Sequence, residues 1–401
     1  MVLVHLTEAL FWASVAVLTY TYVGYLLLLL FLNAVRPDPV RRGSHSPPVT
    51  VIIAAYNEEK ALRAKLENTV QLNYPKHLLE IIVASDCSTD GTDDIVRSFA
   101  ADGVVLCRQR QRLGKTAAQN AAVERARGQI VLFSDATTVY EPDVLTRMIP
   151  YFADPLVGCV TGRVEYRDPA VSAVGHGTRS YWDYEFKLKT YESSVRSLIG
   201  VCGCMYAVRK SAYVPLYHEA CSDFLIATTT VKQGLRAVYE PDAVCFENTN
   251  DRSNQEFKVR VRIIAQTLSD LWRNREMLNP FRQGFYSIEL LSHKLLRYFA
   301  PVLLLVVLLS SAFLARVHWF YLLCFVVQAL FYGVAFTGWL VERIGITNRW
   351  IAMPQYFVIA NLASLVAVVQ FFRGERYARW EPLRENLQSP AVEIINQGSH
   401  V

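Results

Sequence analysis

The sequence carries little charge for its length, and this limits the classes of protein to which it can belong. Only 19% of its 401 residues are charged, whereas 52% are hydrophobic. A soluble enzyme of this size is more polar than that, because its surface must face water. The composition therefore excludes an ordinary soluble enzyme and predicts that part of the chain lies in lipid.

Two kinds of binding site are also missing from the sequence. The formal net charge is only +5 and no basic stripe with interleaved aromatic residues occurs, so no nucleic-acid partner is expected. The eight cysteines are scattered and form none of the paired C-x-x-C units that zinc sites use. We therefore expect reduced thiols in a protein that faces the cytosol.

A long hydrophobic run lies near the start of the sequence. Residues 9–32 contain no charge, and as a helix they are long enough to cross a hydrocarbon core of about 30 Å. Arg36, Arg41 and Arg42 follow the run, whereas a cleaved signal peptide has a shorter apolar core and ends in small residues. This positive flank predicts an uncleaved anchor in the plasma membrane, followed by a cytosolic domain.

Apolar stretches return near the end of the sequence and predict a multi-pass protein in a lipid bilayer. They are residues 298–315, 319–341 and 351–372. Four spans would place the C-terminus across the membrane from the catalytic domain, yet Arg373, Arg376 and Arg379 favour the cytosol. A re-entrant or interfacial path for the last segment, which contains Pro354, would resolve this conflict.

Between the apolar runs, buried-strand patterns alternate with helical patterns. Strand patterns begin at Val49, at Leu79, near Val104 and at Gln129, and each ends in acids, amides or a Gly-Lys pair. The alternation predicts an α/β fold with a mostly parallel, Rossmann-like sheet and polar groups at one edge. Residues 158–246 read as mixed strands and helices.

One of these strands ends in a carboxylate. Residues 129–133 form a buried-strand pattern, and Asp135 follows in a small polar cluster. Open α/β sheets bind ligands at the carboxyl ends of their strands, so Asp135 is a candidate to hold a divalent cation and a diphosphate. The alternative is that Asp135 caps the next helix.

Four motifs occur in a specific order along this part of the chain. They are A-A-Y-N-E at 54–58, D-x-S-x-D-G-T at 86–92, G-K…N at Gly114, Lys115 and Asn120, and S-D-A at 134–136. In this combination the sequence resembles a membrane-embedded family 2 glycosyltransferase with a GT-A domain, similar to hyaluronan, chitin, cellulose and poly-N-acetylglucosamine synthases. The resemblance covers most of the chain. It implies inverting transfer of a hexose or N-acetylhexosamine from a nucleotide-sugar donor, a UDP-sugar, to a growing polysaccharide. The alternative is transfer of a single sugar to a lipid-linked or oligosaccharide acceptor.

The resemblance also implies which residues bind the donor. They are Ala55, Tyr56, Glu58, Asp86, Lys115, Asp135 and Arg262. Asp86 would accept from uracil N3–H and Glu58 would lie near the ribose, while an Asx-turn at Asp86 and a solvated position for Lys115 are the alternatives. Asp135 would hold Mg²⁺ or Mn²⁺. The second acid of the family, two residues later, is Thr137 here.

On the acceptor side, the resemblance points to Gly203, Cys204 and Asp223. Small residues in this segment would let an acceptor approach the backbone closely. Asp223 stands where the family keeps its acidic catalytic motif, and it would be the general base that takes the acceptor's proton. The alternative is that Asp223 only caps a helix.

A basic segment precedes the return of the apolar stretches and places Lys258, Arg260 and Arg262 near one another. Processive members of the family carry a Q-x-x-R-W motif here, and Val259 and Ile263 replace its Gln and Trp. Arg262 could bind a phosphate oxygen with its planar fork. The alternative is an anchor for lipid headgroups.

These observations predict six parts of the chain. They are a transmembrane helix at 1–35, a linker at 36–48, the GT-A domain at 49–276, an interfacial amphipathic helix at 277–297, three transmembrane helices at 298–373 and a polar tail at 374–401. A transporter is disfavoured, because the spans contain almost no ionisable residue. An inactive binding module would not be expected to keep Asp86, Asp135 and Asp223 together.

Overall fold

The computed structural model describes residues 1–44, 46–167, 173–248, 253–343 and 349–375. The chain divides into two compact units. We call them the sheet unit, residues 37–166 and 189–247, and the helical unit, residues 1–36, 167–188 and 248–376.

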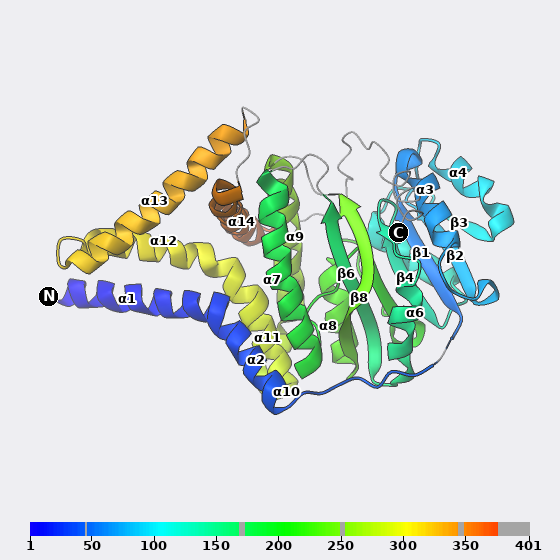
Figure 1. The fold of residues 1–401 in the computed structure, drawn as a ribbon, viewed down its shortest axis with the longest axis horizontal. Coiled ribbons are helices and arrows are strands. Elements are labelled where there is room, and N and C mark those ends of the chain that lie inside the picture. The colour runs from blue at the N-terminus through cyan, green and yellow to red at the C-terminus, as the bar shows by residue number, and fades with distance from the viewer. Residues whose placement is uncertain (45, 168–172, 249–252, 344–348, 376–401) are drawn as a thin grey trace, which may run out of the picture. The chain divides into compact units, whose positions relative to one another are not determined.

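The sheet unit is built on one eight-stranded sheet in the order β3-β2-β1-β4-β7-β6-β8-β5 (Figure 1). The strands are β1 Val49–Ala55, β2 Leu79–Ser85, β3 Val104–Arg108, β4 Ile130–Asp135, β5 Val139–Tyr140, β6 Val157–Arg167, β7 Met205–Arg209 and β8 Arg236–Asn248. Strands β3, β2, β1 and β4 are parallel neighbours. β7 runs antiparallel to β4 and β6, and β5 runs antiparallel to β8. The predicted α/β class is confirmed, and the sheet is parallel in the half that carries the predicted strands.

The parallel strands end together because their register is fixed by burial on both faces. Every residue of β1 is buried. Ala54 pairs with Asp135 of β4, and Ala55 pairs with Ser85 of β2. A slip of one residue would turn every side chain to the opposite face. The polar residues that come after these strands are therefore brought to a single edge of the sheet.

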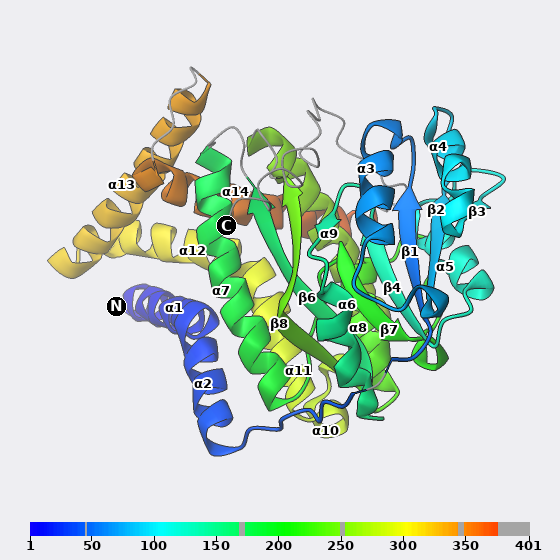
Figure 2. The ribbon, with the colours of Figure 1, turned by 45° about the vertical axis from the view of Figure 1, so that its right-hand side comes forward.

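Helices follow the strands and flank the sheet (Figure 2). They are α3 Glu59–Val70, α4 Thr92–Ser98, α5 Lys115–Arg125, α6 Val144–Met148 and α8 Ser222–Lys232. α5 packs against β1 and β2. The residue before it, Gly114, has a φ of 97°, a left-handed conformation that favours glycine. This turn directs the start of α5, and with it Lys115, to the carboxyl edge of the sheet.

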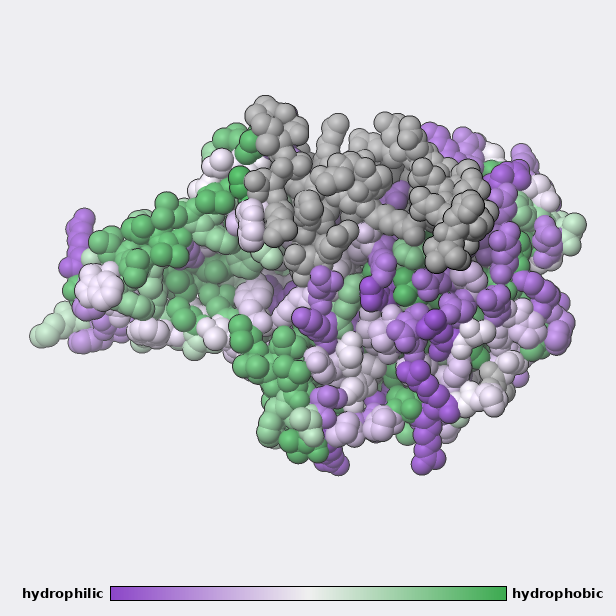
Figure 3. Space-filling view, in the orientation of Figure 1, coloured by the Kyte–Doolittle hydropathy of each residue, from purple (hydrophilic) through white to green (hydrophobic). Residues whose placement is uncertain are grey.

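The helical unit contains four helices that are long and apolar enough to cross a membrane. They are Val2–Val35, Phe285–Leu314, Trp319–Glu342 and Trp350–Phe372. Many large apolar side chains on them are exposed, including Leu6, Phe31, Leu309 and Leu330. Figure 3 shows these apolar surfaces over α2, α12 and α13. All four apolar stretches predicted from the sequence thus form helices with the exposed apolar surface that lipid contact needs.

The first of these helices extends beyond the charge-free run at 9–32. It comprises α1 Val2–Thr19, a π-helical turn Tyr20–Gly24 and α2 Tyr25–Val35. At 1.5 Å per residue its 34 residues extend about 51 Å, well beyond a hydrocarbon core of about 30 Å. The axis bends between α1 and α2 (Figure 1), where π-turns commonly produce kinks.

The interfacial helix predicted at 277–297 is divided in the structure. A short helix, α10 Pro280–Gln283, is followed by α11 Phe285–Glu289, a π-helical turn Leu290–Leu295 and α12 Leu296–Leu314. The last three form the continuous apolar helix that begins at Phe285. His293 is buried, with its Nε2 atom 3.0 Å from Glu185 Oε2 of α7 Ala173–Val195. This contact gives the buried imidazole a partner away from water.

The basic segment forms part of α9 Ser253–Arg273. On a helix, residues two apart point in different directions, whereas residues four apart share a face. Lys258 and Arg262 therefore share a face, and Arg260 lies on another, where its Nε atom is 2.6 Å from Glu256 Oε1. The helix therefore separates Arg260 from the face that Lys258 and Arg262 share.

The last two helices are α13 Trp319–Glu342 and α14 Arg349–Phe372. α14 is continuous despite Pro354 within it, and it packs against α9, α12 and α13. More of α14 is buried than of the other three apolar helices. The predicted polar tail at 374–401 lies outside the described residues, apart from Gly374 and Glu375.

Candidate active site

Asp135 is the last residue of β4, at the carboxyl edge of the parallel strands. A turn and then β5 come after it, and the next helix, α6, begins at Val144 with Asp143 at its N-cap. Asp135 therefore caps no helix. Its side chain is 23% exposed, so the carboxylate is partly open to a ligand.

Lys115, at the start of α5, forms an ion pair with Asp135. Its Nζ atom also lies 3.5 Å from the carbonyl oxygen of Gly203. Burial alone would lower the pKa of Lys115, but the carboxylates of Asp135 and Asp223 raise it above its ordinary value. Lys115 is thus a largely buried ammonium paired with a carboxylate, and the alternative of a solvated helix position is excluded.

Asp223 lies in the first turn of α8, against Gly203. Cys221 is the N-cap of this helix, so Asp223 is not the capping residue. Gly203 has no room for a side chain, because a Cβ atom there would lie 2.4 Å from both carboxylate oxygens of Asp223. The hydroxyl of Ser222 donates to Oδ1 of the same carboxylate at 3.2 Å. Because Gly203 has no side chain, the Asp223 carboxylate can occupy the space beside it.

We expect Gly203→Ala to lower turnover by about 10²-fold, because displacing a catalytic group by about 1 Å costs that much. The new methyl group would push the Asp223 carboxylate from its place. Steady-state kinetics and the melting temperature of one preparation would measure both effects. Gly333→Ala, at a position with open space around it, is the control. Unchanged turnover in Gly203→Ala would contradict this account of how Asp223 is positioned.

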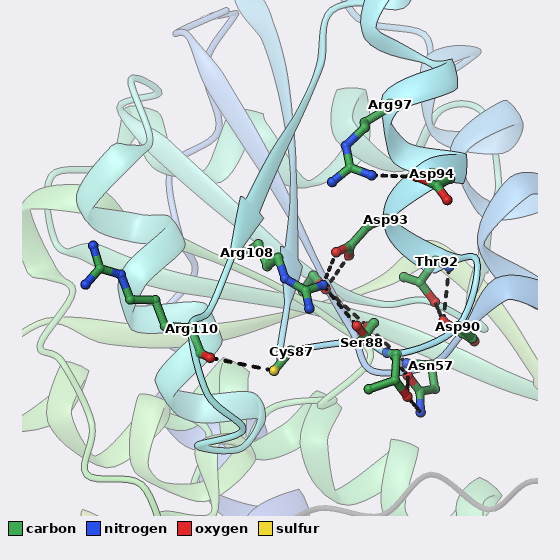
Figure 4. Close-up of polar contacts among 12 residues, drawn as sticks. Asn57, Cys87, Ser88, Asp90, Thr92, Asp93, Asp94, Arg97, Arg108 and Arg110 are labelled. Atoms are coloured by element: carbon green, nitrogen blue, oxygen red, sulfur yellow. Dashed lines mark hydrogen bonds and ion pairs between the residues drawn. The ribbon is translucent and has the colours of Figure 1, made fainter.

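The turns after β1 and β2 are tied together by hydrogen bonds. Asn57, with a φ of 54°, accepts at Oδ1 from the backbone N–H of Thr89 at 2.7 Å. The N–H of Glu58 donates to Thr92 Oγ1 at 2.7 Å. Arg108 braces the second turn by donating to the carbonyl of Ser88 at 2.9 Å and pairing with Asp93 (Figure 4). The two predicted donor-binding turns thus form one rigid ledge.

Asp86 and Tyr56 lie on this ledge. The Asp86 carboxylate is buried and accepts from the backbone N–H groups of Leu113 and Gly114, each at 2.9 Å. These long-range bonds exclude a simple Asx-turn. The backbone N–H of Asp86 donates to the carbonyl of Ala55 at 2.9 Å. The Tyr56 ring lies 3.9 Å from the guanidinium of Arg112. The ledge and the loop before α5 are therefore held as one piece.

Known proteins resemble this part of the chain. Residues 50–214 match the family model described as glycosyl transferase family 2. The chain contains a family 2 glycosyltransferase domain. It is 25% identical to a poly-beta-1,6-N-acetyl-D-glucosamine synthase of Staphylococcus aureus over 57% of this chain and 52% of that one. It is 27% identical to the glycosyltransferase AglE of Haloferax volcanii over 39% of this chain and 52% of that one. The chain thus spans about half the length of these curated relatives.

A solved structure resembles nearly the whole chain. It is the mannosyltransferase PcManGT from Pyrobaculum calidifontis in complex with GDP-Man and Mn²⁺, with a TM-score of 0.69 and 24% identity. The match covers 92% of this chain and 99% of that one. The likeness confirms the predicted GT-A fold of the family 2 domain together with its apolar helices.

Of the predicted site residues, all but one lie in the sheet unit. They are Ala55, Tyr56, Glu58, Asp86, Lys115, Asp135, Gly203, Cys204 and Asp223. Arg262 belongs to α9 of the helical unit, and its phosphate contact stays a prediction. Cys204 is buried, with its Sγ atom 3.3 Å from Cys202 Sγ and 3.6 Å from Cys245 Sγ. These thiols are free, as the sequence predicted.

Glu247 was not anticipated from the sequence. It lies at the end of β8 and accepts from Thr138 Oγ1 at 2.7 Å. Burial, followed by the charge on Asp135, raises the pKa of Glu247 to about 7. The signal was available, because Glu247 is an acid at the end of a strand, as Asp135 is. Glu247 was overlooked because it lies far along the sequence from the four motifs.

Lys65 of α3 was also missed. It is 1% exposed, and its ammonium group lies 3.5 Å from the centre of the Tyr140 ring. Burial lowers the pKa of Lys65 to about 7, although Cys245, Cys204 and Asp135 oppose the shift. The pattern of an amphipathic helix gave no reason to expect a lysine on its buried face.

We expect Lys65→Met to raise the melting temperature at pH 7, with a gain that shrinks towards pH 10. Between pH 7 and the ordinary lysine pKa of 10.5 the unfolded chain binds more protons, so the wild type gains stability as pH rises. Methionine removes this dependence. Thermal unfolding from pH 6 to 10 measures it, with Lys60→Met, exposed on the same helix, as the control. A gain that is constant with pH would contradict the depressed pKa.

The family 2 domain can accommodate a divalent cation. In the described part of the chain, no three His, Cys, Asp or Glu side chains gather to hold a metal alone. Three carboxylates, Asp135, Asp223 and Glu247, nevertheless act on the single ammonium of Lys115. Mg²⁺ and Mn²⁺ favour oxygen ligands, and Mg²⁺ commonly takes one or two carboxylates plus substrate phosphates. This donor set therefore fits a cation that arrives with a diphosphate.

Proposed function

We propose that the protein is an inverting glycosyltransferase that moves a sugar from a UDP-sugar to a hydroxyl of a growing polysaccharide at the cytosolic face of the plasma membrane. One observation carries the proposal. Lys115 pairs with the metal candidate Asp135, is affected by the charge of the base candidate Asp223, and lies 3.5 Å from the Gly203 carbonyl oxygen. The candidate cation ligand, a positive charge and the candidate base therefore lie at one edge of the sheet.

The leaving group would be stabilised at Asp135 and Lys115. Asp135 would hold Mg²⁺ or Mn²⁺, and the bound ion would neutralise charge that develops on the departing diphosphate. Lys115 would add a second positive charge at the same place. Its burial strengthens that effect, because electrostatic interactions are stronger where water is excluded.

The acceptor would be activated at Asp223. Its carboxylate would take the proton of the acceptor hydroxyl while the hydroxyl oxygen forms a bond to the anomeric carbon. The bond from that carbon to the diphosphate oxygen breaks in the same step, so the configuration is inverted. The small residues Gly203 and Cys204 would let the acceptor approach the backbone beside the Asp223 carboxylate.

The donor would lie on the ledge formed by the two turns. Asp86 uses both carboxylate oxygens on backbone N–H groups, and each oxygen keeps a further lone pair for a base N–H. Glu58 would face the ribose. The Staphylococcus aureus relative is a synthase of an N-acetylglucosamine polymer, which supports UDP-N-acetylglucosamine as the first donor to test. GDP-mannose, bound in the similar solved structure, is the second.

Addition of one sugar to a lipid-linked or oligosaccharide acceptor is the alternative. Val259 and Ile263 replace the Gln and Trp that processive members of the family carry, and this difference favours the alternative. The two functions share the chemistry at Asp135 and Asp223 and differ in the length of the product.

The test is transfer by the full chain in lipid nanodiscs. UDP-N-acetylglucosamine, UDP-glucose and GDP-mannose would each be supplied with Mg²⁺ or Mn²⁺ and with glycan and polyprenyl-phosphate acceptors. Mass spectrometry would report product length, and NMR would report the anomeric configuration. We expect a metal-dependent product of inverted configuration. A product that keeps the configuration of the donor, or transfer unaffected by EDTA, would overturn the proposal.

The side of the membrane on which the catalytic domain lies can be tested separately. The positive cluster Arg36, Arg41 and Arg42 follows the first apolar helix, so we expect Ser44→Cys to be protected from an impermeant thiol reagent in intact cells. Gln397→Cys tests the side of the C-terminus. Cys87 and Cys324, the partly exposed native thiols, are first replaced by serine and alanine. Labelling at position 44 from outside would contradict the orientation, because it would place the domain on the side of the membrane opposite the cytosolic donor.

A further inference from the structure

We propose that Glu247 supplies the second protein carboxylate of the divalent-cation site, together with Asp135. The inference rests on the proposed function, because it assumes that a cation binds with the donor at Asp135. It assigns a ligand from β8, far along the chain from the motifs that define the donor site.

The sequence leaves a ligand missing at this site. Thr137 stands two residues after Asp135, where the resemblance places a second acid. Its side chain is exposed, and a neutral hydroxyl is a weaker ligand than a carboxylate for a hard cation. A second carboxylate must therefore come from another part of the chain or be absent.

The pairing of β5 with β8 brings Glu247 to the place where it is needed. Val139 pairs with Phe246, so the residues just outside this ladder, Thr138 and Glu247, are neighbours. The buried Thr138 hydroxyl donates to Glu247 Oε1 at 2.7 Å, and this bond orients the carboxylate. The Thr138 N–H lies 3.5 Å from the Asp135 carbonyl oxygen and closes the turn between them. A metal-binding carboxylate is commonly oriented by such a hydrogen bond.

The charges around Glu247 also fit a shared cation. Asp135 and Asp223 both act on the Glu247 carboxyl, and the ammonium groups of Lys115 and Lys65 are the cations that face the same region. Lys115 is already paired with Asp135, and Lys65 lies over the Tyr140 ring. Asp223 lies against Gly203, on another helix. Among the described acids we therefore assign Asp135 and Glu247, which the turn and the β5–β8 ladder bring together, to the cation, with donor phosphates supplying the remaining oxygens.

The test measures nucleotide binding by calorimetry on the full chain in nanodiscs, with UDP in Mn²⁺ and with UDP in EDTA. We expect Glu247→Gln to weaken Mn²⁺-dependent binding by at least about tenfold, since loss of even an outer-shell partner costs about 10- to 100-fold. Binding in EDTA should not change. Glu124→Gln, an exposed acid of α5, is the matched control.

A second variant supplies the missing acid at the other position. Thr137→Asp in the Glu247→Gln background is expected to restore Mn²⁺-dependent affinity to within about threefold of the wild type, because position 137 is exposed and tolerates the change. Undiminished Mn²⁺-dependent binding in Glu247→Gln would overturn the proposal, as would an equal loss with and without the metal. A wild type that binds neither UDP nor GDP with Mn²⁺ would instead refute the proposed function.

Discussion

Asp223→Asn is expected to lower turnover by about 10²- to 10⁴-fold while leaving donor affinity nearly intact. The amide fills the same space beside Gly203 but cannot take the acceptor's proton. A general base acts in the transition state, so its loss separates ground-state binding from chemistry. Donor affinity, melting temperature and turnover would be measured on one preparation.

The structure sharpens this experiment, because Cys221 and not Asp223 is the N-cap of α8. Loss of a cap would cost about 1 kcal/mol of stability and leave the folded protein active, and the position of Asp223 argues against that outcome. Asp242→Asn, which changes an exposed acid of β8, is the control. Near-normal turnover in Asp223→Asn would refute its role as the base.

Asp135→Asn is expected to abolish transfer and to remove the metal dependence of nucleotide binding. The amide lacks the charge that a hard cation requires. It also leaves the buried ammonium of Lys115 without its ion-pair partner, so some loss of stability accompanies the loss of activity. Calorimetric titration of Mn²⁺ with UDP measures the first effect and thermal unfolding the second.

Asp143→Asn is the matched control for Asp135→Asn. Asp143 follows the same strand at a short distance, but its carboxylate pairs with Arg147 at the surface, 2.6 Å from Nε. Surface pairs contribute little, so this variant should behave as the wild type. If Asp135→Asn kept metal-dependent affinity, the cation would have to be held elsewhere and the site as described would be wrong.

The parallel half of the sheet and the apolar helices could be predicted from the sequence, because both depend on local patterns. Continuous apolar runs predicted β1, β2 and β4, and the polar residues at the ends of these strands predicted where Asp86 and Asp135 lie. Charge-free stretches gave the four long helices. The alternatives for Asp135 and Lys115 could not be settled from the sequence. The alternative for Asp135 depends on whether its strand leads into a turn or directly into a helix. The alternative for Lys115 depends on whether a carboxylate from another part of the chain pairs with it.

Long-range pairing could not be predicted from the sequence. Glu247 reaches the site through a ladder between β5 and β8, and nothing within its own segment indicates this. His293 reads as polar on a helical wheel, but its partner Glu185 comes from a distant helix. The faces on which the basic residues of α9 lie follow from its helical conformation, because a helix and an extended chain distribute alternate residues differently.

The strand order has a consequence for synthesis of the protein on the ribosome. β4 is completed early, but its second neighbour, β7, begins only at Met205, and the β8 strand that carries Glu247 is later still. Domains fold as the chain emerges, and the parallel strands can pair while β4 remains an open edge. An apolar open edge can pair with another chain. The nascent protein therefore exposes an open edge of β4 until β7 has emerged, and the candidate site is complete only when the whole sheet unit has emerged.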